Sequence, residues 1–360
     1  MDLRAEIQKY RQEIKSERMD MSFGEIVNMY REGEIIISPE YQRAFRWDTQ
    51  RQTEFIESIL LGIPFPPIFV ATNPDGKWEL IDGLQRISTV LSFFGELKDE
   101  NGKPGPKNGL GLQKGSIIKS LEGITIDTIP LEYKLQIKRT PCRVEIILKE
   151  SDFKMRYELF KRLNTGGEGL SRQEIRNCIY RGLDTRYNKF VSELSHNPIF
   201  RECIIINQAS EEMMYYEELV LRYLALKNTG TRYTQPNIQD FMDEYLESKC
   251  KNYSQEEVDI DRKIFGNIMK IFEKLKSYEI FKLGRRSFTT SLYDAIMLTL
   301  SSVNAKLDII DIEMLAEKIS TLKVDPEFKK YVGSASSNPT SITNKVEIAK
   351  KLLLGSTARK

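Results

Sequence analysis

Histidine is almost absent from this sequence: His196 is the single one among 360 residues. Nucleases of the H-N-H type, HD phosphohydrolases and zinc sites built on histidine all need more than one imidazole, so this composition excludes them. His196 lies in Ser195-His196-Asn197-Pro198, a pattern typical of a turn after a helix, where we expect a surface role. Any chemistry must therefore be carried by arginine, carboxylate and amide side chains and by the backbone.

Paired cysteines, long apolar runs and net charge are scarce as well. The four cysteines are scattered without paired spacing, which argues for reduced thiols in a cytoplasm and against a cysteine-rich zinc site. No apolar run approaches the length of a membrane helix, and the N-terminus lacks the basic-then-apolar layout of a signal peptide. The formal net charge is only +2, so nucleic-acid binding would need a local basic patch. We expect a cytoplasmic protein with no membrane segment.

The distribution of strand and helix signals predicts an α+β protein with two domains. We expect an α+β domain over residues 1–178 and an all-helical domain over residues 179–360, because strand signals nearly vanish beyond that point. The predicted strands cover residues 35–38, 68–70, 77–81, 124–126 and 142–148. The glycine- and lysine-rich segment 99–116 is interpreted as a mobile surface insertion.

A strand, a tight turn and a helix are predicted around Asp82-Gly83-Leu84-Gln85-Arg86. Apolar residues recur at spacings of three and four from Leu84, so a helix begins there, and Gly83 permits the turn before it. Gln85 and Arg86 then lie in the first helical turn, where unpaired backbone N–H groups and the helix dipole favour phosphate. A guanidinium there adds a planar fork that matches phosphate oxygens. The alternative is that Asp82 only caps the helix and Arg86 is a surface charge.

Two further segments carry residue types that bind anions. Residues 41–47, Tyr-Gln-Arg-Ala-Phe-Arg-Trp, interleave two arginines with three aromatics, which suits ion pairing and stacking with nucleotides or nucleic acid. The same pattern equally fits a loop that its aromatics pin to the core. Residues 164–167, Asn-Thr-Gly-Gly, precede a capping box at Ser171 and Glu174, and this loop either offers N–H groups to an anion or is only a turn.

In this order and spacing, residues 41–47, 82–89 and 160–177 resemble the N-terminal domain of the GmrSD family of modification-dependent restriction systems. That family is similar to the ParB/sulfiredoxin fold, so the resemblance implies this fold for the first domain. The resemblance is close over roughly residues 20–180. Beyond them the chain resembles the family only in its helical character.

The resemblance also implies a site for a nucleoside triphosphate and Mg²⁺. In this fold class a Gly-x-x-Arg helix start holds nucleotide phosphates, which here is Gly83 to Arg86. The residues implied in nucleotide contact are Gln42, Arg43, Arg46, Gly83, Arg86, Ser88, Asn164, Thr165 and Gly166.

Catalytic roles in hydrolysis are implied for Arg86, Gln85 and Asp82. Arg86, with Arg43, would stabilise charge on the transferred phosphoryl group, and Gln85 or Gln42 would orient water. Asp82 or Glu40 would hold Mg²⁺, usually through waters, and no dedicated metal-ligand set is assigned.

Two departures from the family pattern limit what is carried over. Leu84 stands where the family usually has glutamine, which removes one polar contact. Sulfiredoxins place their catalytic cysteine at the same position, so Leu84 excludes their chemistry. Full-length GmrSD proteins also carry an H-N-H nuclease domain, which a chain with His196 alone cannot supply.

These features predict a nucleotide-binding and NTP-hydrolysing subunit of a bacterial anti-phage or restriction system, acting with a separate nuclease or toxin subunit. One alternative is a ParB-like DNA-binding clamp that contacts DNA phosphates through residues 41–47 and Arg285-Arg286. Another is a non-catalytic antitoxin or scaffold for a neighbouring toxin nuclease. Its docking surface would be the apolar stripe Leu3, Ile7, Tyr10 and Ile14. A monomer and a homo-oligomer both stay open.

Overall fold

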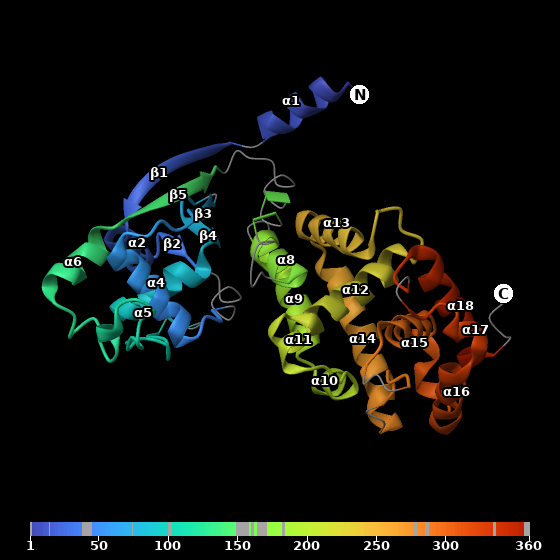
Figure 1. Ribbon diagram of the computed structural model, residues 1–360. Helices are drawn as coiled ribbons and strands as arrows, with labels where there is room; N and C mark the ends of the chain where they lie inside the picture. Colours follow the sequence, from blue (N-terminus) through green and yellow to red (C-terminus); the bar gives the residue numbers. More distant parts are fainter. Residues whose placement is uncertain are drawn as a thin grey trace. The chain divides into compact units, whose positions relative to one another are not determined.

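The computed structural model divides the chain into two compact units, Met1–Leu170 and Ser171–Lys360 (Figure 1). It describes residues 2–13, 15–37, 45–73, 75–99, 103–148, 158–159, 162–163, 171–181, 184–276, 279–284, 288–333 and 336–355. The boundary predicted after residue 178 falls inside helix α8 (Arg172–Arg181), which belongs to the second unit.

A mixed five-stranded sheet with the order β1-β5-β3-β4-β2 organises the first unit. Its strands are β1 (Ser16–Ser22), β2 (Ile35–Ile36), β3 (Ile68–Thr72), β4 (Trp78–Asp82) and β5 (Pro141–Ile147). Because β3 is parallel to β5 and antiparallel to β4, the starts of β3 and β5 and the end of β4 lie at the same end of the sheet. This end carries Asp82 and Gly83, the start of the predicted phosphate turn. The prediction of an α+β protein is confirmed.

The strand predictions fail in two places. The predicted strand at residues 124–126 is wrong: this stretch forms turns, and the Thr125 N–H donates to Thr128 Oγ1 at 2.9 Å. β1 was not predicted, because its sequence Ser-Glu-Arg-Met-Asp-Met-Ser is polar and mostly exposed. It becomes a strand by pairing antiparallel with β5, where the cross-strand partners Arg18 and Glu145 form an ion pair of 2.9 Å.

The described helices of the first unit are α1 (Leu3–Glu13), α2 (Phe23–Glu32), α4 (Thr49–Leu61), α5 (Leu84–Phe94) and α6 (Leu131–Arg139), with a 3₁₀ turn at Lys119–Leu121. Two of them, α2 and α4, begin and end where their capping residues predict. Ser22 and Asp48 accept hydrogen bonds from the first turns of α2 and α4, and both helices end at left-handed glycines. α4 packs against α5 and α6, and Ile56, Leu91 and Val144 are fully buried in the core.

Residues 103–118 are anchored to the core, so their interpretation as part of a mobile surface insertion is wrong. Leu112 is 2% exposed, and the Asn108 amide bonds both the N–H and the carbonyl of Leu97. The buried Glu57 carboxylate accepts the N–H groups of Ile117 at 2.8 Å and Ile118 at 2.5 Å. The glycine-rich composition concealed these anchors, because the partners lie far away in the sequence.

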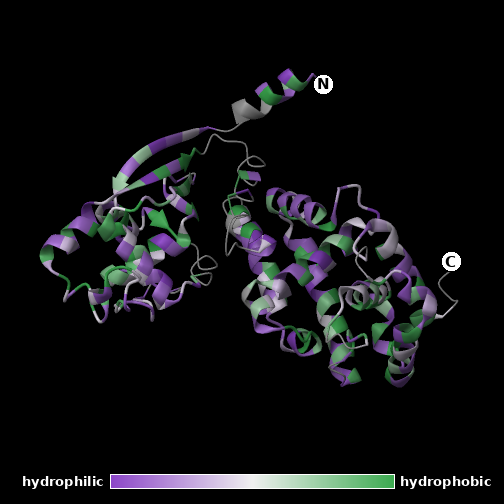
Figure 2. Cartoon of the chain, in the orientation of Figure 1, coloured by the Kyte–Doolittle hydropathy of each residue, from purple (hydrophilic) through white to green (hydrophobic). Residues whose placement is uncertain are grey.

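Helices supply all the regular structure described in the second unit. They are α8, α9 (Thr185–Ser195), α10 (Pro198–Cys203), α11 (Gln208–Glu212), α12 (Tyr215–Thr229), α13 (Ile238–Lys251), α14 (Gln255–Leu275), α15 (Thr290–Ser302), α16 (Ile312–Val324), α17 (Pro326–Lys329) and α18 (Pro339–Leu354), with a 3₁₀ helix at Asn304–Ile309. Figure 2 shows hydrophobic and hydrophilic residues interleaved along these helices, as expected where one face is buried. The capping box that opens α8 is confirmed, since Ser171 and Glu174 exchange side-chain-to-N–H bonds of 3.1 and 2.6 Å.

Candidate functional site

Gly83 forms the turn between β4 and α5, and the turn requires glycine. Its φ is +98°, in the left-handed region, and a Cβ there would lie 2.5 Å from Ile68 Cγ2. Gly83 is also the N-cap residue of α5, and it supplies no side-chain cap hydrogen bond to the helix. The alternative in which Asp82 caps the helix is therefore wrong.

Arg86 lies in the first turn of α5 and is held by three oxygen atoms. Its Nη2 is 2.9 Å from Asp82 Oδ2 and 3.2 Å from the Pro67 carbonyl, and its Nη1 donates to the Pro66 carbonyl at 2.6 Å. The Arg86 side chain is only 12% exposed, while that of Asp82 is 31% exposed. Arg86 is thus oriented at the sheet end and is not a free surface charge. The two carbonyls are neutral hydrogen-bond acceptors. A charged phosphate oxygen accepts a stronger hydrogen bond from a guanidinium than a neutral carbonyl does.

Gln85 fastens the segment Phe45–Trp47 to the same helical turn. Its Oε1 accepts the N–H groups of Arg46 at 3.1 Å and Trp47 at 3.0 Å. The Gln52 amide donates to the Trp47 carbonyl at 2.8 Å, and Phe45 is 2% exposed. The described part of the arginine–aromatic segment is therefore pinned to the core by its aromatics, and Arg46 is brought beside the turn that carries Arg86.

Lys107 also contacts this segment, and sequence reasoning missed it. Its ammonium donates to the Phe45 carbonyl and lies 4.6 Å from the centroid of the Phe45 ring. Its own carbonyl accepts from Ser92 on α5. Burial of the ammonium lowers the pKa of Lys107. No local signal separates Lys107 from the other lysines of this insertion, so its role becomes visible only in three dimensions.

Of the other residues predicted to contact a ligand, Ser88 is buried and the rest lie outside the described residues. Ser88 is fully buried on α5, and its Oγ has no hydrogen-bond partner among the described residues. This places Ser88 in the core behind the first turn. The residues outside the described part of the chain are Glu40, Gln42, Arg43, Asn164, Thr165, Gly166, Arg285 and Arg286.

Cys142 lies next to the site but is chemically quiet. It is 1% exposed on β5, and burial raises its pKa to about 11, although the positive charge of Arg86 opposes this rise. The thiol is therefore protonated at neutral pH and is a poor nucleophile.

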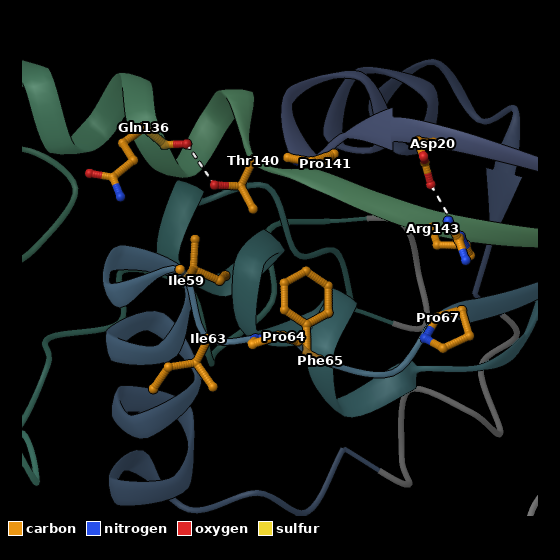
Figure 3. Close-up of a pocket in the computed structure, with 11 residues that line it drawn as sticks. Asp20, Ile59, Ile63, Pro64, Phe65, Pro67, Gln136, Thr140, Pro141 and Arg143 are labelled. Carbon is orange, nitrogen blue, oxygen red and sulfur yellow. Dashed lines mark hydrogen bonds and ion pairs between the residues drawn. The ribbon is translucent and has the colours of Figure 1, made fainter.

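A separate pocket with a volume of about 480 Å³ lies beside residues 62–67, the connector between α4 and β3 whose Pro66 and Pro67 carbonyls bond Arg86 (Figure 3). Apolar side chains of α4 and the connector line it, including Ile59, Ile63 and Phe65. At its rim Asp20 and Arg143 form an exposed ion pair of 3.4 Å. Pro67 lines this pocket and also supplies a carbonyl to Arg86, so the pocket and the α5 turn share one wall. Among the described residues, none of those predicted to contact nucleotide lines it.

The described residues also bear on metal binding and on membrane spanning. Within them, no three or more His, Cys, Asp or Glu side chains gather in an arrangement suited to a metal ion. The described helices include none with the length and apolarity needed to cross a bilayer.

Comparison with known families identifies the part of the chain that carries the site. Residues 23–181 match the family described as GmrSD restriction endonuclease, N-terminal domain. These residues are similar to the GmrSD N-terminal domain, and the match covers less than half of the chain. The resemblance inferred from the sequence is therefore confirmed. No curated protein and no solved structure matches the chain.

The matched segment runs from α2 through α8 and so includes the whole site around α5. The α5 turn, the Phe45–Trp47 segment and Lys107 all fall inside the matched residues. α1, β1 and the helices from α9 onward lie outside the match. The chain is thus related to restriction systems through the domain that holds Arg86.

Proposed function

We propose that this chain is a nucleotide-binding and NTP-hydrolysing subunit of a bacterial anti-phage or restriction system, with a ParB/sulfiredoxin-like N-terminal domain. The observation that supports it best is the start of α5. There the helix begins at a glycine N-cap, which has no side chain to occupy the space before the first turn, and Arg86 is fixed in that turn. Helix N-termini of this kind bind phosphate.

In this proposal Arg86 exchanges acceptors when nucleotide binds. Phosphate oxygens replace the carbonyls of Pro66 and Pro67, because a charge-assisted bond to phosphate is stronger than a bond to a neutral carbonyl. The first-turn N–H groups of α5 bind the same phosphate. Arg46, fastened to this turn through Gln85, supplies a second positive charge.

The residues around the α5 turn fit a nucleotide whose Mg²⁺ is held mainly by the phosphates and not by the protein. Asp82 is a single carboxylate, already paired with Arg86, so it would reach Mg²⁺ through water and not as part of a protein cage. When bound, Mg²⁺ would neutralise charge on the phosphate oxygens. Binding is supported by the α5 geometry, whereas hydrolysis is supported by the family resemblance.

A separate nuclease or toxin subunit completes the proposal, with both proteins in the cytoplasm. His196 is an exposed residue at the end of α9, and its Nδ1 lies 2.7 Å from the Ser192 carbonyl. It therefore lacks the histidine partner that an H-N-H nuclease needs. DNA cleavage in this system would then belong to another chain.

One observation favours the scaffold alternative. Leu3 and Ile7 on α1 are 68% and 47% exposed, so this part of the predicted apolar stripe is uncovered in the chain alone. A partner protein docking there would cover it. Co-expression with the neighbouring genes, comparing wild type with Leu3→Ser/Ile7→Ser, tests this. Equal recovery of a partner by both chains argues against the stripe.

The main proposal is tested by measuring binding and phosphate release with each of the four NTPs, with and without DNA. Arg86→Ala should weaken binding by about tenfold or more, because charged hydrogen bonds contribute about 1.5–3 kcal/mol each. Arg86→Lys shows whether charge alone is sufficient. Arg139→Ala, an exposed arginine on α6, is the control and should bind like wild type. Absence of binding in wild type, or equal binding by Arg86→Ala, contradicts the proposal.

A further inference from the structure

The backbone of Phe45–Trp47 is held by side chains from three separate elements. Gln85 on α5 accepts two of its N–H groups, and Gln52 on α4 donates to the Trp47 carbonyl. Lys107, from segment 103–118, donates to the Phe45 carbonyl. A buried carbonyl needs such a partner, and Phe45 is only 2% exposed.

Lys107 holds Phe45 in two ways at once. The ammonium donates to the carbonyl and also lies 4.6 Å from the ring centroid, which adds a cation–π attraction. Carbonyl and ring together fix both the position and the orientation of this residue. A lysine lying loosely on the surface of this segment would not make both the hydrogen bond and the cation–π contact.

Lys107 is itself fixed relative to α5. Its carbonyl accepts from Ser92, which lies two turns after the helix start, and the neighbouring Asn108 bonds both backbone groups of Leu97 just beyond the helix end. The lysine therefore links the far end of α5 to Phe45, while Gln85 links the near end to Arg46. The two links together set the position of Arg46 relative to Arg86.

We propose that Lys107 is a positioning residue of the nucleotide site, which seats Phe45–Trp47 so that Arg46 and Arg86 act on the same phosphates. This role rests on the proposed nucleotide binding. The insertion that carries Lys107 is then part of the site architecture, although it contributes no residue to any of the recognised motifs. Lys107 itself need not touch the nucleotide.

The test compares Lys107→Met, Lys107→Arg and Lys114→Met in the full chain. Lys114 is an exposed lysine of the same insertion and provides the matched control. Each NTP is titrated by calorimetry, and amide hydrogen exchange is followed at Arg46 and Trp47. We expect Lys107→Met to weaken binding by about tenfold, the size expected for one charged hydrogen bond. Exchange at both amides should accelerate, while the melting temperature of the second unit stays unchanged.

The conservative variant separates positioning from general destabilisation. Lys107→Arg should restore binding to within about threefold, because a guanidinium also donates to a carbonyl and stacks on a ring. Lys114→Met should match wild type in both measurements. Wild-type binding and wild-type exchange in Lys107→Met would overturn the positioning role. If wild type binds no nucleotide, the proposed function fails, and the exchange rates still decide whether Lys107 fixes Phe45–Trp47.

Discussion

Arginine–aspartate pairs occur in both units, but they differ in what surrounds them. In the second unit Arg222 on α12 and Asp294 on α15 form two hydrogen bonds of 2.7 and 2.6 Å, and their side chains are 6% and 0% exposed. In the first unit Arg86 shares its guanidinium between Asp82 and two carbonyls, and Asp82 is 31% exposed. The Arg222–Asp294 pair lies inside a helical core, whereas the Arg86–Asp82 pair lies at the open end of a sheet.

This difference decides which arginine is available to a ligand. Removing one member of a buried pair leaves an uncompensated charge, so the buried pair cannot exchange partners. The pair at the sheet end retains access to solvent through Asp82, and its other acceptors are neutral. A short arginine motif therefore gains functional meaning from its surroundings and not from the presence of an ion pair.

Breaking the buried pair should produce the largest effect on stability. Asp294→Ala should lower the free energy of unfolding by about 3–5 kcal/mol, because Arg222 is left buried and unpaired. Urea denaturation of the full chain measures it. Asp259→Ala, which breaks an exposed pair with Arg262, should cost at most about 1 kcal/mol. Similar losses in the two variants would show that burial does not distinguish the pairs.

Substitution at the α5 turn should have an intermediate effect. Gly83→Ala places a methyl group against Ile68 and Arg86 at a φ of +98°, and Gly76→Ala introduces similar backbone strain at +85° with nothing within 4 Å. Each should lose about 1–3 kcal/mol from backbone strain, and Gly83→Ala should lose more. Only Gly83→Ala should also weaken nucleotide binding. Equal denaturation midpoints would contradict the close approach of Gly83 to Ile68.

Lys345 should make the smallest contribution, visible as a pH dependence of the second unit. Burial lowers its pKa from 10.5 to about 8, and its ammonium bonds Ser291 and the Ser336 carbonyl. Between these pH values the unfolded chain binds the extra proton, so Lys345 by itself makes the free energy of unfolding rise with pH from about 8. Burial raises the pKa of the Cys203 and Cys250 thiols to about 12, and these groups oppose that rise because they ionise first in the unfolded chain. Burial raises the pKa of Tyr215 to about 12, so stability should fall again once unfolded tyrosines ionise near pH 10.

The difference in free energy of unfolding between wild type and Lys345→Met, measured from pH 7.5 to about 9.5, isolates the lysine, because the cysteines contribute equally to both chains in a window below tyrosine ionisation. The free energy of unfolding of wild type should increase relative to that of the variant as pH rises over this range. An equal slope in both chains would assign the dependence to other groups.

The sequence predicts local features of this protein well, because their causes are local. The helix start at Leu84 follows from apolar spacing, and the turn at Gly83 follows from its position after a strand. The partners of these residues were not predictable, since Gln85 bonds residues 38 and 39 positions away and Arg86 bonds carbonyls 19 and 20 positions away. Such contacts depend on the order of strands in the sheet.

Residues whose conformation is imposed by tertiary contacts account for the errors. β1 is polar and pairs only because β5 lies beside it, whereas residues 124–126 have strand propensity and form turns. Lys107 belongs to the same class, since its importance comes from Phe45, which lies 62 positions earlier in the chain.

The connector Pro66-Pro67 has a consequence for how fast and how tightly a phosphate could be captured. Proline has a fixed φ and no N–H, so this pair has less backbone freedom than two other residues would have. The Arg86 guanidinium is hydrogen-bonded to both proline carbonyls, and a long side chain ordered during folding loses little rotamer freedom on binding. The proline pair would therefore lower the entropy cost of binding the proposed phosphate.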